Sequence, residues 1–214
     1  MRNSKDFIFV IENFIVLLLI HSVGGYFFAP ILINTYPHIP EITLRLICST
    51  AVSPVVAICY LAFRSGFIPR NIVNRETFSA TVSGIIFVWL MYFVKLLIFG
   101  KYSVANPSTF YYLIKIFIIV IWAPLIEEIL FRGYYYELLK SKGDVFAILV
   151  SSTMFVMAHA IFVGSGIDFY LLLELTLLFL HSIIYCVVYK RGGLASSVLT
   201  HVFTSAYATF VYFK

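Results

Sequence analysis

The sequence predicts an all-α fold, a polytopic bundle of about seven transmembrane helices. Of the 214 residues, 62% are hydrophobic and 12% are charged, which is about half the charged fraction of a soluble domain. Long apolar runs recur from one end of the chain to the other, and each can cross about 30 Å of hydrocarbon as a helix. The runs do not alternate apolar and polar residues as barrel strands do, so helices are the spanning elements that remain.

Seven apolar runs, separated by turn-forming residues, are the expected spans. They are residues 7–28, 46–63, 82–99, 110–139, 145–163, 169–189 and 194–213. Arg2 and Lys5 precede the first run as in a signal peptide, but Glu12 interrupts it and no small-residue cleavage site follows. We therefore expect a retained helix. The fourth run is too long for one perpendicular span, so it is expected to be tilted, or broken near Pro124.

Lysine and arginine are distributed unevenly between the connecting segments. With the N-terminus in the cytoplasm, the cytoplasmic segments hold Arg2, Lys5, Arg64, Arg70, Arg75, Lys140, Lys142, Lys190 and Arg191. The opposite side holds Arg45, Lys101 and Lys214. This asymmetry predicts a multi-pass protein of the cell membrane with a cytoplasmic N-terminus. Because the net charge of +5 comes from short clusters between apolar runs, the expected partner is the lipid bilayer and not nucleic acid.

The densest polar cluster inside an apolar run begins at Glu127 and Glu128 and ends at Arg132. Glu128 and Arg132 are four residues apart, so they share one helix face and can form an ion pair. Glu127 points about 100° away from Glu128, so the same arginine does not simply absorb its charge. A separate carboxylate in a low-dielectric site can accept and release protons, which makes Glu127 a candidate catalytic group.

Two histidines, His159 and His201, lie in the fifth and seventh runs. At 1.5 Å per residue, Glu127, His159 and His201 lie about 15 to 22 Å of helix from the cytoplasmic ends of their runs. The three groups therefore reach similar depths, and we expect them to meet in one intramembrane pocket. The matched depth favours function, although a single intramembrane histidine is often only a hydrogen-bond partner between helices.

Other polar groups have a structural interpretation. The Glu128–Arg132 pair is typical of a brace between or within helices rather than of a catalyst. Glu174 and His181 lie seven residues apart on the sixth run and share a helix face, so they are interpreted as helix contacts.

At the polar residues of the second half, the sequence resembles the CPBP family, which contains the type II CAAX prenyl endopeptidases and the bacteriocin-processing Abi-type intramembrane proteases. The matching residues are Glu127, Glu128 and Arg132 for the motif EExxxR, Phe155 and His159 for FxxxH, and His201 for a histidine of the last core helix. The resemblance covers about residues 110–214. It implies N-terminal transmembrane helices over residues 1–105 and a CAAX-protease-like catalytic core over residues 106–214.

The resemblance also implies a mechanism and a set of roles. Glu127 and His159 would polarise a water that attacks a peptide carbonyl, and His201 would stabilise the oxyanion that forms. Glu128 and Arg132 would fix the helix and orient Glu127. No cofactor is expected. One carboxylate and two histidines could bind zinc, but no HExxH helix carries them, so zinc is only the open alternative.

Three functions follow, in order of preference. The first is an intramembrane endopeptidase acting on a membrane-associated peptide or protein, in bacteriocin or pheromone processing or in self-immunity. The second is a catalytically weak or inactive immunity or scaffold protein of the same fold. It is favoured by Ser205, which stands where the family often has an asparagine that assists the last histidine. The third is a small proton-coupled transporter, which would also use intramembrane Glu and His, but the chain shows no inverted repeat.

Overall fold

A computed structural model of the chain describes residues 2–23, 29–35, 44, 48, 53–65, 71–99, 116–160 and 169–212. Every element over these residues is a helix, which confirms the all-α prediction. The peripheral helices are α1 Arg2–Val23, α2 Ala29–Thr35, α4 Ser53–Ser65, α5 Thr77–Phe99, α9 Asp144–Ala160, α10 Phe169–Gly192 and α11 Leu194–Tyr212. The central helical stretch comprises η3 Phe117–Trp122, α7 Ala123–Glu128, η4 Ile129–Tyr136, α8 Glu137–Leu139 and η5 Lys140–Lys142.

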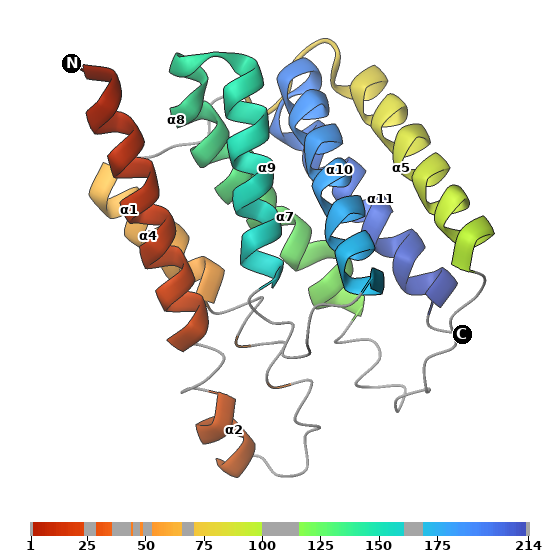
Figure 1. The fold of residues 1–214 in the computed structure, drawn as a ribbon, viewed down its shortest axis with the longest axis horizontal. Coiled ribbons are helices and arrows are strands. Elements are labelled where there is room, and N and C mark those ends of the chain that lie inside the picture. The colour runs from red at the N-terminus through yellow and green to blue at the C-terminus, as the bar shows by residue number, and fades with distance from the viewer. Residues whose placement is uncertain are drawn as a thin grey trace.

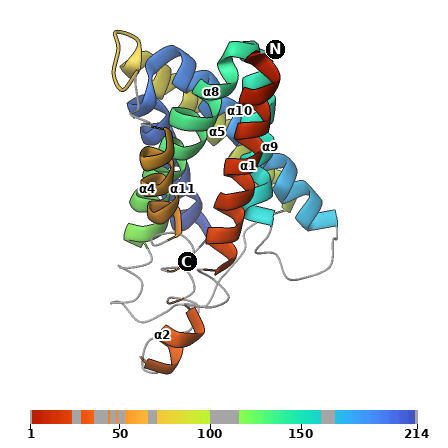
Figure 2. The ribbon, with the colours of Figure 1, turned by 90° about the vertical axis from the view of Figure 1, so that its left-hand side faces the viewer.

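The long helices run alternately up and down, with the N-terminus at one end of the bundle and the C-terminus at the other (Figure 1). The pair α1 and α4 lies on one side of the central stretch, α5 lies at the far side, and α9, α10 and α11 lie between (Figures 1 and 2). Neighbouring helices are joined at one end by contacts such as the ion pair between Lys190 of α10 and Asp144 of α9. The central stretch, which carries the EExxxR motif, is thus surrounded by other helices.

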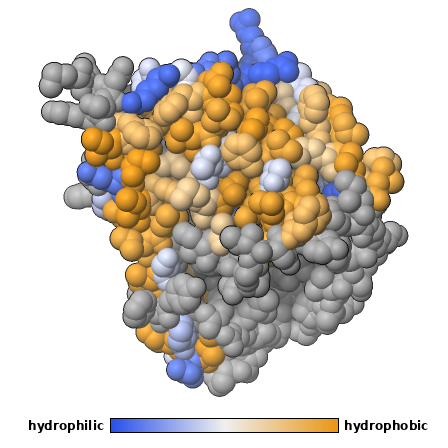
Figure 3. Space-filling view, viewed as in Figure 1, coloured by the Kyte–Doolittle hydropathy of each residue, from blue (hydrophilic) through white to orange (hydrophobic). Residues whose placement is uncertain are grey.

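Each of the seven expected spans coincides with a helix over its described residues. Residues 24–28, 46–47, 49–52, 110–115, 161–163 and 213 of these spans lie outside the described residues. By length and apolar composition, two helices of the described part could cross a membrane, over Thr77–Lys95 and Leu171–Gly192. The number of seven membrane crossings therefore stays a prediction. The surface agrees with a lipid environment, because hydrophobic side chains cover most of the described face below a hydrophilic upper end (Figure 3).

Of the two alternatives for the fourth run, the break near Pro124 is wrong, because helical structure continues from Phe117 to Lys142. Pro124 lies in the first turn of α7, and the residues before it, Trp122 and Ala123, keep right-handed helical dihedral angles. A proline lacks a backbone donor and its ring crowds the carbonyl four residues earlier. The wider π-type turns of η3, which immediately precede it, accommodate this mismatch without ending the helix.

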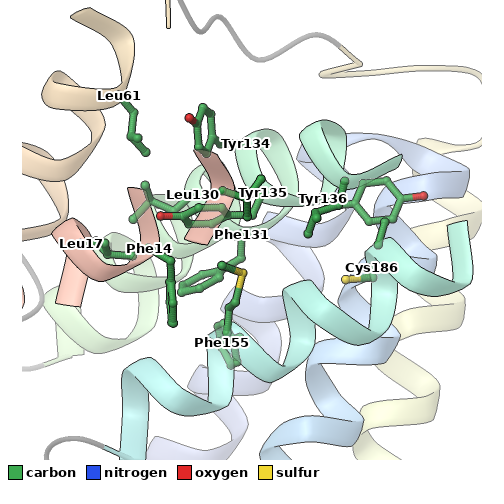
Figure 4. Packing of buried hydrophobic residues seen from close by; sticks show 14 of the residues in the cluster. Phe14, Leu17, Leu61, Leu130, Phe131, Tyr134, Tyr135, Tyr136, Phe155 and Cys186 are labelled. Carbon is green, nitrogen blue, oxygen red and sulfur yellow. The ribbon is translucent and has the colours of Figure 1, made fainter. Parts of the chain in front are cut away.

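An aromatic layer fills the core between α1, η4 and α9 (Figure 4). Phe131 and Phe155 meet edge to face with ring centroids 5.1 Å apart, and Phe14 meets Tyr135 in the same way at 5.9 Å. All four side chains are almost fully buried. Large rigid rings that interlock in this way hold the central stretch against α9 and fix the turn that carries Glu127 and Glu128.

Helix α5 packs closely against α10 and α11. A methyl group added at Gly84 would lie 2.6 Å from Val188 and 2.8 Å from Thr200, so only glycine permits this approach. At the end of the bundle, the N–H of Leu194 donates to the carbonyl of Asn71 at 2.8 Å, across a junction where Gly193 has a φ of 83°. The division at residues 105 and 106 stays a prediction, although α5 lies before it in sequence and packs on helices after it.

Candidate active site

The buried half of the site is an ion pair with two further partners. Arg132 Nη1 donates to Glu128 Oε1 at 3.0 Å, and neither side chain has any exposed surface. Arg132 Nη2 also donates to the carbonyl and the hydroxyl of Ser182 on α10, at 2.9 and 2.6 Å. The guanidinium lies against the rings of Phe155 and Tyr185, 4.8 and 5.3 Å from their centroids. Because buried charges need such compensation, this arrangement explains how the pair is tolerated in an apolar core.

The open half of the site contains the second carboxylate. Glu127 Oε1 lies 3.8 Å from His159 Nε2, and Glu127 Oε2 lies 3.8 Å from His201 Nε2. The three side chains come from three helices, α7, α9 and α11. The structure thus brings together the three groups that the sequence placed at matched depth. Both distances exceed that of a direct hydrogen bond, and they suit a bridging water.

The hydrogen bonds of the two histidines define which ring nitrogens face Glu127. His159 Nδ1 lies 2.8 Å from the carbonyl of Phe155, and a carbonyl can only accept, so Nδ1 carries the hydrogen. His201 Nδ1 lies 2.9 Å from Oε1 of Glu128, a carboxylate that likewise accepts. In the neutral form of each ring, Nε2 is therefore a hydrogen-bond acceptor that points toward Glu127.

The contact between Glu128 and His201 was missed by sequence reasoning, which expected Glu128 to fix the helix with Arg132 and to orient Glu127. The two residues are 73 positions apart, so no local spacing could reveal it. Tyr185 was also missed: its ring stacks on the His201 imidazole with centroids 4.5 Å apart and planes 21° apart. The sequence offered one signal for Tyr185: it carries a polar hydroxyl within the sixth apolar run, four positions after His181.

Phe155 and Ser205 have different surroundings. The Phe155 ring is fully buried and lies 4.5 Å from the ring of His159 and 5.9 Å from that of His201. It therefore forms a wall of the site behind both histidines. Ser205 follows His201 by one turn of α11 and is half-buried. Its hydroxyl makes no hydrogen bond to another residue in the described part of the chain, so its expected role beside His201 stays a prediction.

Glu174 and His181 make contacts between helices, in agreement with their interpretation. Glu174 of α10 forms an ion pair with Lys95 of α5. The ring of His181 lies against that of Tyr92 of α5, with centroids 5.0 Å apart. Both contacts join α10 to α5, and neither residue lies between Glu127 and the two histidines.

Exposure separates the two halves of the site. The side chains of Glu128 and Arg132 are fully buried, whereas those of Glu127 and His159 are 17% and 37% exposed. Glu127 and His159 therefore have surface that another molecule can contact, whereas the Glu128–Arg132 pair has none. Glu127 lies 3.8 Å from an imidazole nitrogen of each histidine, and such a set of groups can hold and polarise one water molecule.

The donor set of one carboxylate and two imidazoles also occurs in zinc enzymes. Tetrahedral zinc with bonds of about 2.0 Å places its ligand atoms about 3.3 Å apart, closer than the 3.8 Å between Glu127 and either histidine. Among the residues that the structure describes, no cluster of His, Cys, Asp or Glu side chains has the spacing of a metal site. The metal-free reaction stays a prediction.

Comparisons with known proteins point to one family. Residues 109–207 match the family described as type II CAAX prenyl endopeptidase Rce1-like. No curated protein and no solved structure gives a significant match. The matched residues include α9, α10, most of α11 and all of the EExxxR motif, and hence every group of the candidate site. The expected resemblance is confirmed: residues 109–207 of this chain form a domain of the Rce1-like type II CAAX prenyl endopeptidase family.

Proposed function

We propose that this protein is an intramembrane endopeptidase, which hydrolyses a peptide bond in a membrane-associated peptide or protein. The observation that carries the proposal is the placement of Glu127 between His159 and His201, 3.8 Å from Nε2 of each. The Rce1-like domain supports a protease at the level of the family. Membership in a family does not by itself specify a chemistry, and the convergence of one carboxylate and two imidazoles supports hydrolysis by an activated water.

Glu127 is the proposed general base. It accepts a proton from a water held between its carboxylate and His159 Nε2, and the water oxygen forms a bond to the peptide carbonyl carbon. The carbonyl electrons move onto oxygen in the tetrahedral intermediate. When the C–N bond breaks, Glu127 returns the proton to the departing amine. His159 orients the water, because its Nδ1–H is fixed by the Phe155 carbonyl and Nε2 is free to accept.

His201 is the proposed stabiliser of the oxyanion. In its protonated state, Nδ1–H is bound by Glu128 and Nε2–H can donate to the negatively charged oxygen. Glu128 and Tyr185 act as positioning residues, since the first fixes the Nδ1 hydrogen and the second stacks on the ring. The Ser205 hydroxyl, one helical turn further on, supplies a second donor when it rotates toward the oxyanion.

The proposed setting is a cell membrane crossed several times, with the N-terminus in the cytoplasm. The proposed reaction needs no cofactor, because Glu127 and His159 together activate the water. Processing of a bacteriocin or pheromone precursor, or self-immunity through cleavage of a membrane protein, would each supply a suitable substrate.

A comparison of peptide termini in membranes tests this function and identifies the substrate in the same experiment. Cells that express the wild-type chain or Glu127→Gln at equal levels are compared for new N-termini and C-termini in the membrane and medium. We expect a set of termini present with the wild type and lost with Glu127→Gln, because the amide cannot accept the proton from water. The matched control is Glu76→Gln, which alters an exposed glutamate remote from the site.

The same variants separate an enzyme from a binding protein of the same fold. If Glu127→Gln and His159→Ala both keep full biological activity at normal expression, the peptidase function is wrong and a scaffold or immunity role remains. Equal sets of termini from the wild type and Glu127→Gln would lead to the same conclusion.

A further inference from the structure

A groove of about 190 Å³ lies between α5 and α10, outside the candidate active site. These are the two helices whose length and apolar composition suit a membrane span, and they lie side by side (Figure 1). Ala80, Gly84 and Phe87 line the groove from α5, and Ile184 and Val188 line it from α10. In each set the residues are three or four positions apart, so one face of each helix forms one wall of the groove.

The walls of this groove are apolar over most of its length. Its lining contains one hydroxyl, that of Ser83, which donates to the carbonyl of Ser79 within α5 at 2.8 Å. Phe87 and Val187, which also line the groove, are exposed on the outer surface of the bundle. For a helix pair in a membrane, that surface meets lipid hydrocarbon, so the walls suit an acyl chain.

One end of the groove carries an arginine. Arg191 is the last residue but one of α10, and it lines the groove together with Ala80 in the first turns of α5. From Arg191 to Ile184 the groove extends about 10 Å along α10, at 1.5 Å per residue. A guanidinium at the end of a membrane helix reaches the level of the lipid headgroups.

The surroundings of Arg191 carry an excess of positive charge. Asn74 Nδ2 donates to the backbone carbonyl of Arg191 at 2.9 Å, which holds the residues before α5 beside the end of α10. In this segment Glu76 pairs with Arg191 at 3.4 Å, but both side chains are more than half exposed, and such a pair is weak. The adjacent Arg75 is exposed and makes no ion pair with any residue that the structure describes. An anion at this end would therefore be attracted.

We propose that this groove binds an anionic phospholipid, with an acyl chain between α5 and α10 and the phosphate at Arg191. The guanidinium can donate two N–H bonds to one phosphate, a geometry that the two groups share. A zwitterionic phospholipid offers the same chain and phosphate, but its own ammonium group offsets the negative charge. The uncompensated Arg75 therefore selects the anionic lipid.

The bound lipid joins α5 to α10 on the outer side of the bundle. The same turns of α10 carry Ser182 and Tyr185, which contact Arg132 and the ring of His201. The lipid therefore stabilises the helix packing behind the candidate active site without contacting its reacting groups. Its binding does not depend on the peptidase function, so it can be measured without any substrate.

Lipid binding to the purified whole chain in detergent tests the phosphate site. The probes are dioleoyl phosphatidylglycerol and dioleoyl phosphatidylcholine, which share their chains and differ in net charge, and native mass spectrometry measures the affinity for each. We expect the wild type to prefer the anionic lipid by about fivefold or more, and Arg191→Gln to lose the preference. Glu76→Gln is the matched control, because it removes the same ion pair and keeps the arginine. Equal affinities in the wild type, or a preference that survives Arg191→Gln, would overturn the proposal.

A second pair of variants tests the groove itself. Val187→Trp fills the groove, whereas Leu180→Trp places the same side chain elsewhere on α10, and both native side chains are 42% exposed. We expect Val187→Trp to weaken binding of the anionic lipid by about tenfold or more and Leu180→Trp to leave it unchanged. Equal binding by the two tryptophan variants would refute the groove as the lipid site. A change of oligomeric mass in Val187→Trp would assign the groove to a contact between two copies of the chain and would also refute the proposal. The Arg191→Gln comparison decides the matter independently if Val187→Trp does not fold.

Discussion

Two adjacent carboxylates on one helix have opposite surroundings. Glu128 is sealed, with Arg132 and His201 bound to the same oxygen atom. Glu127 is partly exposed and lies 3.8 Å from each of its imidazole neighbours. The difference shows that adjacent residues of one helical turn can have different roles. The buried Glu128 stabilises the packing of the helices, and the partly exposed Glu127 has room beside it for a water molecule. The consequence of this difference is that substitutions in the two halves should fail in different ways.

The largest effect is expected on activity in the open half. Glu127→Gln should reduce peptidase activity by about 100-fold to 10,000-fold, the usual contribution of a general base. The thermal midpoint in detergent should stay close to that of the wild type, because Glu127 makes no direct hydrogen bond with either histidine at 3.8 Å. A large loss of thermal stability in this variant would mean that Glu127 belongs to the framework and that the two halves do not differ.

The next effect is expected on stability in the sealed half. Arg132→Met leaves Glu128 buried without its ion-pair partner, which should cost about 3 to 5 kcal/mol of folding free energy. Thermal unfolding in detergent measures the loss. The matched control combines Arg132→Met with Glu128→Gln, which removes both charges and should recover part of the stability. If Arg132→Met alone were as stable as the wild type, the Glu128–Arg132 pair would not have the stabilising role given to it here.

A smaller effect is expected at the contact between the central stretch and α10. Ser182→Ala removes the hydroxyl that accepts from Arg132 at 2.6 Å but keeps the backbone carbonyl at 2.9 Å. Loss of one hydrogen bond to a buried charged group should cost about 1 to 3 kcal/mol, which thermal unfolding can detect. The control is Ser141→Ala, which alters an exposed serine and should change stability little. Equal behaviour of the two variants would show that Arg132 does not need the Ser182 hydroxyl.

The smallest effect is expected at the ion pair between Lys190 of α10 and Asp144 of α9. A hydrogen bond from Lys190 holds the pKa of Asp144 below its usual range. A lowered folded-state pKa means that the pair contributes stability above the unfolded pKa of about 3.9 and loses it as pH falls through the folded value. Asp144→Asn should therefore change the thermal midpoint slightly at pH 7, and by less at an acidic pH below about 3.9. A change that is equal at both pH values would assign the effect to something other than the charge.

The helices and the site residues followed from the sequence to different extents. Apolar runs predicted the helices because burial in an apolar medium depends on composition and length, which are local properties. The pairing of Glu128 with Arg132 followed from the spacing of four residues on one helix. The continuity of the helix through Pro124 did not, since the widened turns that accommodate the ring depend on packing around them.

The sequence by itself determined the helical class, the family of residues 109–207 and the identity of Glu127, His159 and His201 as candidates, since these rest on composition, motif order and helical depth. Tertiary structure alone decided which histidine nitrogen faces Glu127, that Glu128 binds His201, and that Glu127 is partly exposed while Glu128 is fully buried. Those features join residues from different helices. The distances between these residues depend on how whole helices pack, which cannot be read from the spacing of residues along the chain.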